Sequence, residues 1–199
     1  MTTLAASFTA SPQLWYLTRA TAIVAFVLLT VDFGLGLAST QRLRESRYWP
    51  RFATQQLHRN VALLALGFTV MHILTTVIDT FVQVGWWAVA VPFTSTYDSL
   101  GVAMGTFAFD AILLVIGTSL VRERISLRAW RAIHWIVYAM WPLAFGHFLI
   151  TGTDAAHGRW GLYLALASLG VLVAATAARW STSARRHSLT VMPRVAGLR

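Results

Sequence analysis

Histidine is the residue type in this chain best suited to chemistry, and four of its six histidines lie within long apolar stretches. An imidazole can bind a metal, relay a proton, or donate and accept hydrogen bonds. Inside a membrane an ionisable side chain is costly, so such residues are rare there unless they serve a site. The four residues are His58, His72, His134 and His147. Their positions therefore indicate one or more functional sites.

The spacing of these histidines indicates two sites. His58 and His72 are fourteen positions apart, and His134 and His147 are thirteen apart. On a helix these are rises of about 21 Å and about 20 Å, too far for the two histidines of one segment to share a metal. Because one further span separates the two segments, they run in the same direction, so His58 lies level with His134 and His72 with His147. Two axial histidines complete the coordination of a haem iron, which favours electron transfer over chemistry at the iron.

The second pair carries a geometric difficulty. Fourteen residues return a helix to within about 40° of the same face, whereas thirteen leave it about 140° away. Pro142 lies between His134 and His147. A proline removes one helical hydrogen bond and bends the helix, so we expect a kink or local bulge that corrects the direction of these side chains.

The elements that position the histidines belong in lipid. Of the 199 residues, 57% are hydrophobic and 12% are charged, and the mean hydropathy is +0.62, which is unlike a soluble domain. We predict an all-α polytopic membrane helix bundle that forms a single domain over residues 1–199. About five apolar segments reach the ~20 residues that a crossing helix needs. They cover roughly residues 14–38, 57–81, 100–121, 130–152 and 160–180.

The basic residues predict the orientation of these helices. All sixteen are arginine, and thirteen follow the first, third and fifth predicted helices. They are Arg42, Arg44, Arg47, Arg51, Arg122, Arg124, Arg128, Arg131, Arg179, Arg185, Arg186, Arg194 and Arg199. The positive-inside rule therefore predicts an N-terminus outside and a cytoplasmic basic tail over residues 181–199. The net charge of +9 is thus explained by topology, without nucleic acid. An alanine-rich composition without lysine points to a bacterial plasma membrane.

The sequence also limits the cofactors. It contains no cysteine, which excludes disulfides, cysteine-ligated iron–sulfur clusters and the attachment of a c-type haem. Any haem is therefore non-covalent. We find no strand followed by a glycine-rich loop, and so no flavin or nicotinamide domain. The apolar segment Val82 to Phe93 is too short to span a bilayer, and its two tryptophans suit the outer membrane surface.

The pattern His58-x13-His72, followed two helices later by His134-x12-His147, resembles the ferric reductase-like transmembrane domain. This family forms the haem-bearing core of NADPH oxidases, ferric reductases and bacterial methionine sulfoxide reductase haem subunits. The resemblance implies two haem b groups, an inner one on His58 and His134 and an outer one on His72 and His147. Residues 14–21 are also similar to the first helix of bacterial members. The resemblance covers roughly residues 14–180.

The sequence departs from the family pattern in two ways. Many members have six spans with the ligands on the third and fifth, whereas we predict five spans with the ligands on the second and fourth. Many also continue into a cytoplasmic flavin and nicotinamide domain. The resemblance therefore implies a separate electron donor, either a cytoplasmic flavoprotein or a quinol, and an outer acceptor or redox protein. The other expected partner is the lipid bilayer, and we nominate no catalytic residue.

Three charged residues inside the predicted helices have more than one interpretation. Arg19, near the outer end of the first helix, either snorkels to the interface or pairs with a propionate of the outer haem. Asp32 and Asp110 need a partner or a proton in lipid, so a proton-handling role and a helix–helix hydrogen bond both stay open.

The expected function is that of a di-haem membrane cytochrome b, the membrane subunit of an oxidoreductase. Two other classes stay open. A proton channel or transporter would use the same histidines as a relay and would be colourless, although no inverted repeat or glycine-interrupted helix pair supports it. A haem-free structural subunit would carry histidines that bind nothing.

Overall fold

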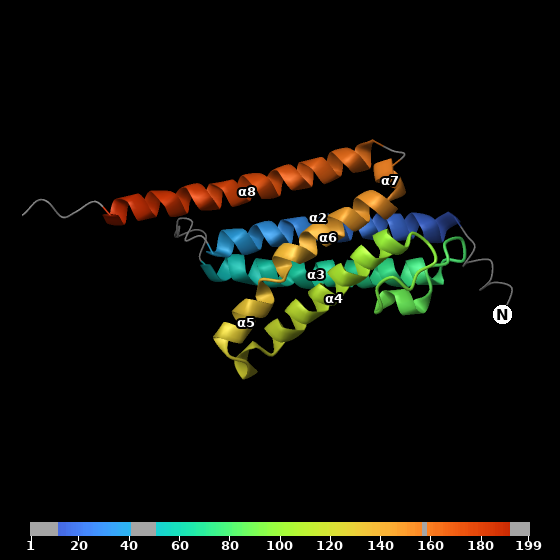
Figure 1. Cartoon of the computed structure of the whole chain (residues 1–199), viewed down its shortest axis with the longest axis horizontal. Helices are drawn as coiled ribbons and strands as arrows, with labels where there is room; N and C mark the ends of the chain where they lie inside the picture. Colours follow the sequence, from blue (N-terminus) through green and yellow to red (C-terminus); the bar gives the residue numbers. More distant parts are fainter. Residues whose placement is uncertain (1–11, 41–50, 157–158, 192–199) are drawn as a thin grey trace, which may run out of the picture.

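The structure, a computed structural model, describes residues 12–40, 51–156 and 159–191, and this part of the chain is helical without strands. Five helical segments are long and apolar enough to cross a membrane, which confirms the predicted all-α polytopic bundle. Figure 1 shows them running back and forth along one long axis. The long helices are α2 (Pro12–Thr40), α3 (Arg51–Ile78), α4 (Ser99–Leu120), α6 (Val137–Thr151) and α8 (Trp160–Val191).

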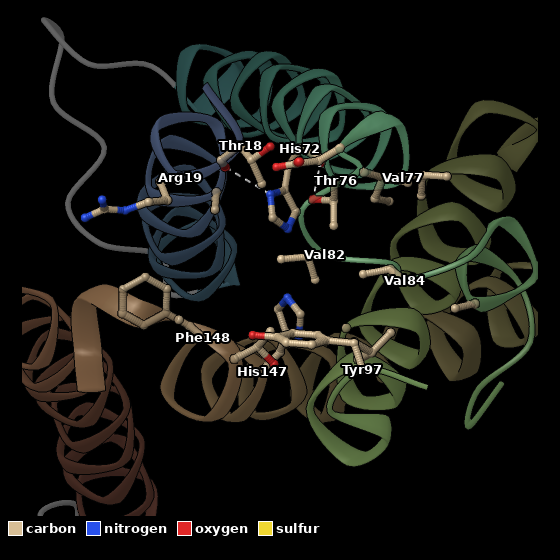
Figure 2. A pocket seen from close by; sticks show the side chains of 18 of the residues that line it. Thr18, Arg19, His72, Thr76, Val77, Val82, Val84, Tyr97, His147 and Phe148 are labelled. Carbon is tan, nitrogen blue, oxygen red and sulfur yellow. Dashed lines mark hydrogen bonds between the residues drawn. The ribbon is translucent and has the colours of Figure 1, made fainter. Parts of the chain in front are cut away.

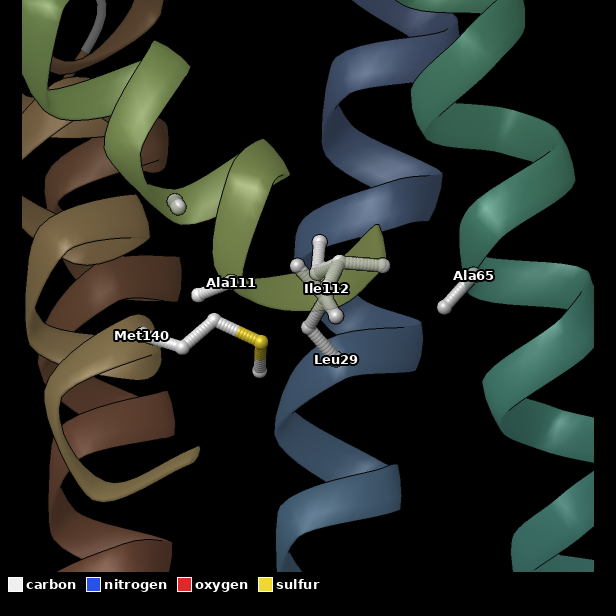
Figure 3. Close-up of a cluster of buried hydrophobic side chains, with 6 residues drawn as sticks. Leu29, Ala65, Ala111, Ile112 and Met140 are labelled. Carbon is white, nitrogen blue, oxygen red and sulfur yellow. The ribbon is translucent and has the colours of Figure 1, made fainter. Parts of the chain in front are cut away.

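The bundle is built from two helix pairs. Helix α2 packs along α3, and α4 packs along α6, while α8 lies outside against α2 and α6 (Figure 1). A cluster of buried side chains joins the two pairs, with Leu29 from α2, Ala65 from α3, Ile112 from α4 and Met140 from α6 (Figure 3). In the sequence, Ala65 lies midway between His58 and His72, and Met140 lies midway between His134 and His147. The apolar cluster therefore separates the two histidine levels.

A second cluster of buried hydrophobic side chains packs α8 against the bundle. Phe26 of α2 stacks on Phe148 of α6, with ring centroids 4.8 Å apart, and both pack with Ala165 and Leu172 of α8. Across the same contact, Trp141 Nε1 donates a hydrogen bond to Thr30 Oγ1 over 3.1 Å. Such hydrogen bonds satisfy polar groups that have no water to bind inside a bilayer.

The fourth membrane-spanning segment is interrupted. We predicted one helix over residues 130–152, whereas the structure has α5 (Leu127–His134), two turn residues and then α6. At the break, three backbone amides bond to the carbonyl three residues earlier: Ile136 to Ile133, Tyr138 to Trp135 and Ala139 to Ile136. A residue in a 3₁₀ turn rotates the chain by about 120° around the helix axis, whereas a residue in an α-helix rotates it by about 100°. Three such residues therefore add roughly 60° of rotation between His134 and His147, in the direction that brings the two side chains toward the same face. Pro142 lies inside α6, one turn beyond.

Short elements close one end of the bundle. The segment Val82 to Phe93 folds against α4 around the 3₁₀ helix η1 (Trp86–Val89), where Thr106 Oγ1 donates to the Ala88 carbonyl over 2.6 Å. Trp86 and Trp87 stay exposed. The same end carries the four-residue helix α7 (Thr153–Ala156), whereas the 3₁₀ helix η2 (Arg122–Arg124) lies at the opposite end beside α5.

Helix α8 is longer than predicted, since it continues from Trp160 to Val191 and includes the first part of the expected basic tail. Among the thirteen arginines, Arg42, Arg44, Arg47, Arg194 and Arg199 lie outside the described residues. The remaining helices agree with the predicted ranges to within a few residues, apart from α3, which begins six residues earlier.

Candidate functional site

The structure brings the four membrane histidines together as two pairs. The ring centroids of His58 and His134 are 6.4 Å apart, with the ring planes at 78°. The centroids of His72 and His147 are 6.2 Å apart, with the planes at 68°. His58 and His72 come from α3, His134 ends α5, and His147 belongs to α6.

These separations leave room for one metal atom between each pair of rings. A metal–imidazole nitrogen bond is about 2 Å long and a ring nitrogen lies about 1 Å from the ring centre, so two imidazoles on opposite sides of a metal have centroids about 6 Å apart. In the described residues no third histidine, cysteine, aspartate or glutamate completes a metal-binding group. A metal held there would need its other donors from a bound group, as a porphyrin provides.

The hydrogen bonds of the His72/His147 pair orient both rings. His72 Nδ1 lies 3.1 Å from the carbonyl oxygen of Thr18, and His147 Nδ1 lies 2.7 Å from that of Gly101. A carbonyl oxygen can only accept, so each Nδ1 carries the hydrogen and each Nε2 keeps its lone pair. Figure 2 shows the two rings pointing toward one another across the cavity. This is the arrangement in which a histidine binds a metal through Nε2 while a neighbour fixes its tautomer.

A cavity of about 360 Å³ surrounds this pair. Its walls come from α2, α3, α4 and α6, and residues of the segment 79–97 close one end, among them Asp79, Val82, Val84 and Tyr97 (Figure 2). The lining is mostly apolar, with a few hydroxyl and carboxyl groups. One of them, Thr18 Oγ1, is buried without a hydrogen-bond partner in the described part of the chain. A buried polar atom without a partner is unusual and fits a bound group that offers one.

Two glycines of α4 lie beside His147, and Gly105 makes room for its ring. A Cβ atom added at Gly105 would lie 2.8 Å from His147 Nδ1, closer than real Cβ contacts. Gly101 provides the carbonyl that His147 bonds, and a Cβ there would clash with Asp98 and Thr151. Only glycine at position 105 lets the ring approach the helix backbone this closely.

The His58/His134 pair is oriented differently. His58 Nδ1 lies 2.8 Å from Asp32 Oδ1 and 3.2 Å from the backbone oxygen of the same residue. The Trp130 ring stacks on His134, with centroids 4.7 Å apart and planes at 23°. His134 Nδ1 is buried without a hydrogen-bond partner in the described part of the chain. One ring is therefore held by a hydrogen bond to a backbone carbonyl with a carboxyl oxygen beside it, and the other ring is held by stacking.

Arg19 has a protein partner in the structure. Its Nε donates to Asp154 Oδ2 over 2.9 Å, and its Nη2 bonds Asp154 Oδ1, while its guanidinium lies 4.1 Å from the centroid of the Trp15 ring. Arg19 lines the cavity, but Figure 2 shows its charged end pointing away from the space between His72 and His147. The predicted propionate contact stays a prediction.

Sequence reasoning missed the groups that orient the rings. It weighed Asp32 only as a proton carrier or a helix contact, and it gave Thr18, Gly101 and Gly105 no role. A backbone carbonyl leaves no mark in the sequence. One signal in the sequence could have found Asp32. It lies in the last third of α2, and the next helix, α3, begins with the turns that contain His58, so the two residues come close together.

The five apolar helices define a multi-pass membrane protein. A family model described as "Ferric reductase like transmembrane component" matches residues 19–145, more than half of the chain, and the protein belongs to this family. It is therefore a membrane redox component, and the resemblance inferred from the histidine spacing is confirmed. The matched range contains His58, His72 and His134 and ends two residues before His147. Neither a curated protein nor a solved structure matches the chain.

Proposed function

We propose that the protein is a di-haem cytochrome b that carries single electrons across the plasma membrane as the membrane subunit of an oxidoreductase. The observation that carries the proposal is the pairing of histidines at two levels, with ring centroids 6.4 Å and 6.2 Å apart. Haem bound at these levels would supply one-electron redox chemistry at its iron. Family membership and the absence of a third protein ligand in the described residues favour this cofactor over a bare metal ion.

The residues of the chain bind and orient the two groups. His58 and His134 would bind one haem, and His72 and His147 the other, as in the two-level arrangement the spacing predicts. If both imidazoles of a pair bound a haem iron, they and the porphyrin would complete its coordination, so the iron would offer no open position to a substrate. The residues therefore provide binding, orientation and exclusion of water, and we assign no catalytic acid or base.

The proposed orientation puts the His58/His134 pair toward the cytoplasm. Arg122, Arg124, Arg128 and Arg131 lie in η2 and α5, at the end of the bundle that holds this pair. Positive residues concentrate on the cytoplasmic side of membrane proteins. A cytoplasmic flavoprotein or a membrane quinol would then donate electrons near His58 and His134. An outer acceptor or redox protein would receive them near His72 and His147.

The test is a cofactor count. The full chain, expressed with sufficient haem and purified in detergent, is examined by oxidised and dithionite-reduced spectra and by a pyridine haemochrome assay. We expect two b haems per chain with low-spin bands. A colourless protein would sink the proposal and favour a proton channel or a haem-free subunit. One haem per chain would leave one of the two histidine pairs without its proposed role.

A further inference from the structure

The two histidine pairs differ in the charge of the group that faces the imidazole Nδ1. At one level His72 and His147 face neutral backbone carbonyls, those of Thr18 and Gly101. At the other level His58 Nδ1 also faces a backbone carbonyl, that of Asp32 at 3.2 Å. In addition, Asp32 Oδ1 lies 2.8 Å from the same nitrogen, in ion-pair contact but without a hydrogen-bond partner in the described part of the chain. The aspartate side chain is 15% exposed and the histidine side chain 27%, so water screens this contact only in part. Among the described residues, His58 is the one of the four whose ring nitrogen lies within ion-pair distance of a carboxylate, while Asp79 and Asp154 line the cavity around the other pair.

The protonation of His58 Nδ1 follows from the ligand role proposed above. When Nε2 binds a metal, Nδ1 carries the hydrogen of the neutral ring and donates it. The backbone oxygen of Asp32 then accepts this hydrogen, and the Asp32 side chain lies beside the same nitrogen. A carboxylate in this position stabilises positive charge on the ring and makes the imidazole a more electron-rich ligand than a carbonyl alone does. An electron-rich ligand and a nearby negative charge both favour the oxidised iron, so they lower its reduction potential.

We propose that Asp32 is a positioning residue that holds the haem of the His58/His134 pair at a lower reduction potential than the haem of the His72/His147 pair. The inference rests on the proposed function and adds to it a potential difference built into the chain. An electron that reaches the His58/His134 level would then move to the His72/His147 level with a favourable free energy. Asp32 acts through His58, since the structure places its carboxylate on the far nitrogen of that ring.

The experiment is a spectroelectrochemical titration of the holoprotein, following the reduced haem band in the wild type and in Asp32→Asn. The amide keeps the shape of the side chain but removes its charge. We expect the lower of the two potentials to rise by an amount equivalent to about a tenfold change in the equilibrium constant, or about 59 mV for one electron. The higher potential should stay unchanged. Asp32→Glu, which keeps a carboxylate, should return the lower potential most of the way to its wild-type value.

A matched control is Asp110→Asn, which makes the same change from acid to amide at an exposed position of α4. It should move neither potential. If Asp32→Asn and Asp110→Asn give the same shift, or if Asp32→Asn shifts nothing, the inference is overturned.

A second measurement tests the assignment of the two potentials even if Asp32→Asn does not fold. In titrations of the single-haem proteins His58→Ala and His72→Ala, the low-potential component should disappear only in His58→Ala. If it disappears in His72→Ala, the assignment is wrong. A wild type without haem would instead contradict the proposed function, so the two failures are distinguishable.

Discussion

The two histidine pairs have nearly equal ring separations but are held by different means. At the His72/His147 level two backbone carbonyls fix the tautomers, Gly105 admits one ring against α4, and residues of the segment 79–97 line the cavity. At the His58/His134 level a backbone carbonyl and a carboxyl oxygen of Asp32 lie beside one ring, and a tryptophan stacks on the other. The His72/His147 level depends on backbone groups, whereas the His58/His134 level depends on side chains as well.

The distance between paired histidines and the groups that surround their rings are therefore separate properties of the fold. The spacing follows from helix geometry, since each pair joins α3 to the segment that contains α5 and α6. The environment follows from whichever helix packs beside each ring. Substitutions beside the ligands should therefore act on one level and leave the other unchanged.

The largest expected effect comes from the ligands themselves and tests the pairing. His58→Ala, His72→Ala, His134→Ala and His147→Ala should each reduce the haem content from two to one per chain. Combining His58→Ala with His134→Ala should remove no more than either alone, because both ligands serve one group. Combining His58→Ala with His72→Ala should remove both. Haemochrome assays measure the content, and His187→Ala serves as a control outside the paired set. Loss of both groups in the first combination would contradict the pairing.

A smaller effect is expected from Gly105→Ala, which should weaken only the His72/His147 level. The added methyl group would lie 2.8 Å from His147 Nδ1, so the ring must move away from the Gly101 carbonyl. We expect several-fold lower haem occupancy at this level, read from the spectrum of the His58→Ala background. Gly117→Ala in the same helix meets no atom within 4 Å and should have no effect. Equal losses in both variants would show that helix stability, and not ring placement, is responsible.

A stability effect is expected from Arg19→Ala near the His72/His147 level. The substitution leaves the buried carboxylate of Asp154, whose side chain is 6% exposed, without its guanidinium. Losing the partner of a buried polar group costs about 1–3 kcal/mol, so the thermal unfolding midpoint in detergent should fall. Replacing Asp154 with Asn as well should recover part of the loss. If haem content falls while the midpoint is unchanged, Arg19 acts on the cofactor and the propionate interpretation gains support.

The smallest effect is expected from Gly36→Ala at the His58/His134 level. A Cβ at this position would lie 3.4 Å from His58 Cε1, which is an ordinary contact. Haem content and both reduction potentials should stay within error of the wild type. A loss as large as that of Gly105→Ala would contradict the view that only the other level depends on close backbone approach.

The fold was largely predictable from the sequence because lipid imposes strong rules. Every backbone polar group must be paired inside the segment, so apolar stretches of sufficient length become helices. The predicted ranges erred where the sequence gives no stop signal. Helix α8 continues to Val191 because no proline or glycine interrupts it after residue 180 until Pro193.

The sequence predicted which histidines form each candidate site, but it did not predict the groups that surround their rings. Spacing alone placed His58 level with His134 and His72 level with His147. The break at residues 135 and 136 was expected only as a kink related to Pro142, because the overwound turn depends on local backbone geometry that no residue type specifies. The contact between Asp32 and His58 joins residues 26 positions apart, and it depends on how α2 and α3 pack.

The length of α8 has a mechanical consequence. At about 1.5 Å per residue, its 32 residues extend about 48 Å, whereas the hydrocarbon core of a bilayer is about 30 Å thick. The sequence turns polar after Ser181, with Arg185, Arg186 and His187, so the last part of the helix extends beyond the length that a bilayer core requires. A fluorophore attached there would follow the direction of α8, because the helix is continuous from Trp160 to Val191. Its polarised emission in oriented membranes would therefore report the tilt of this helix.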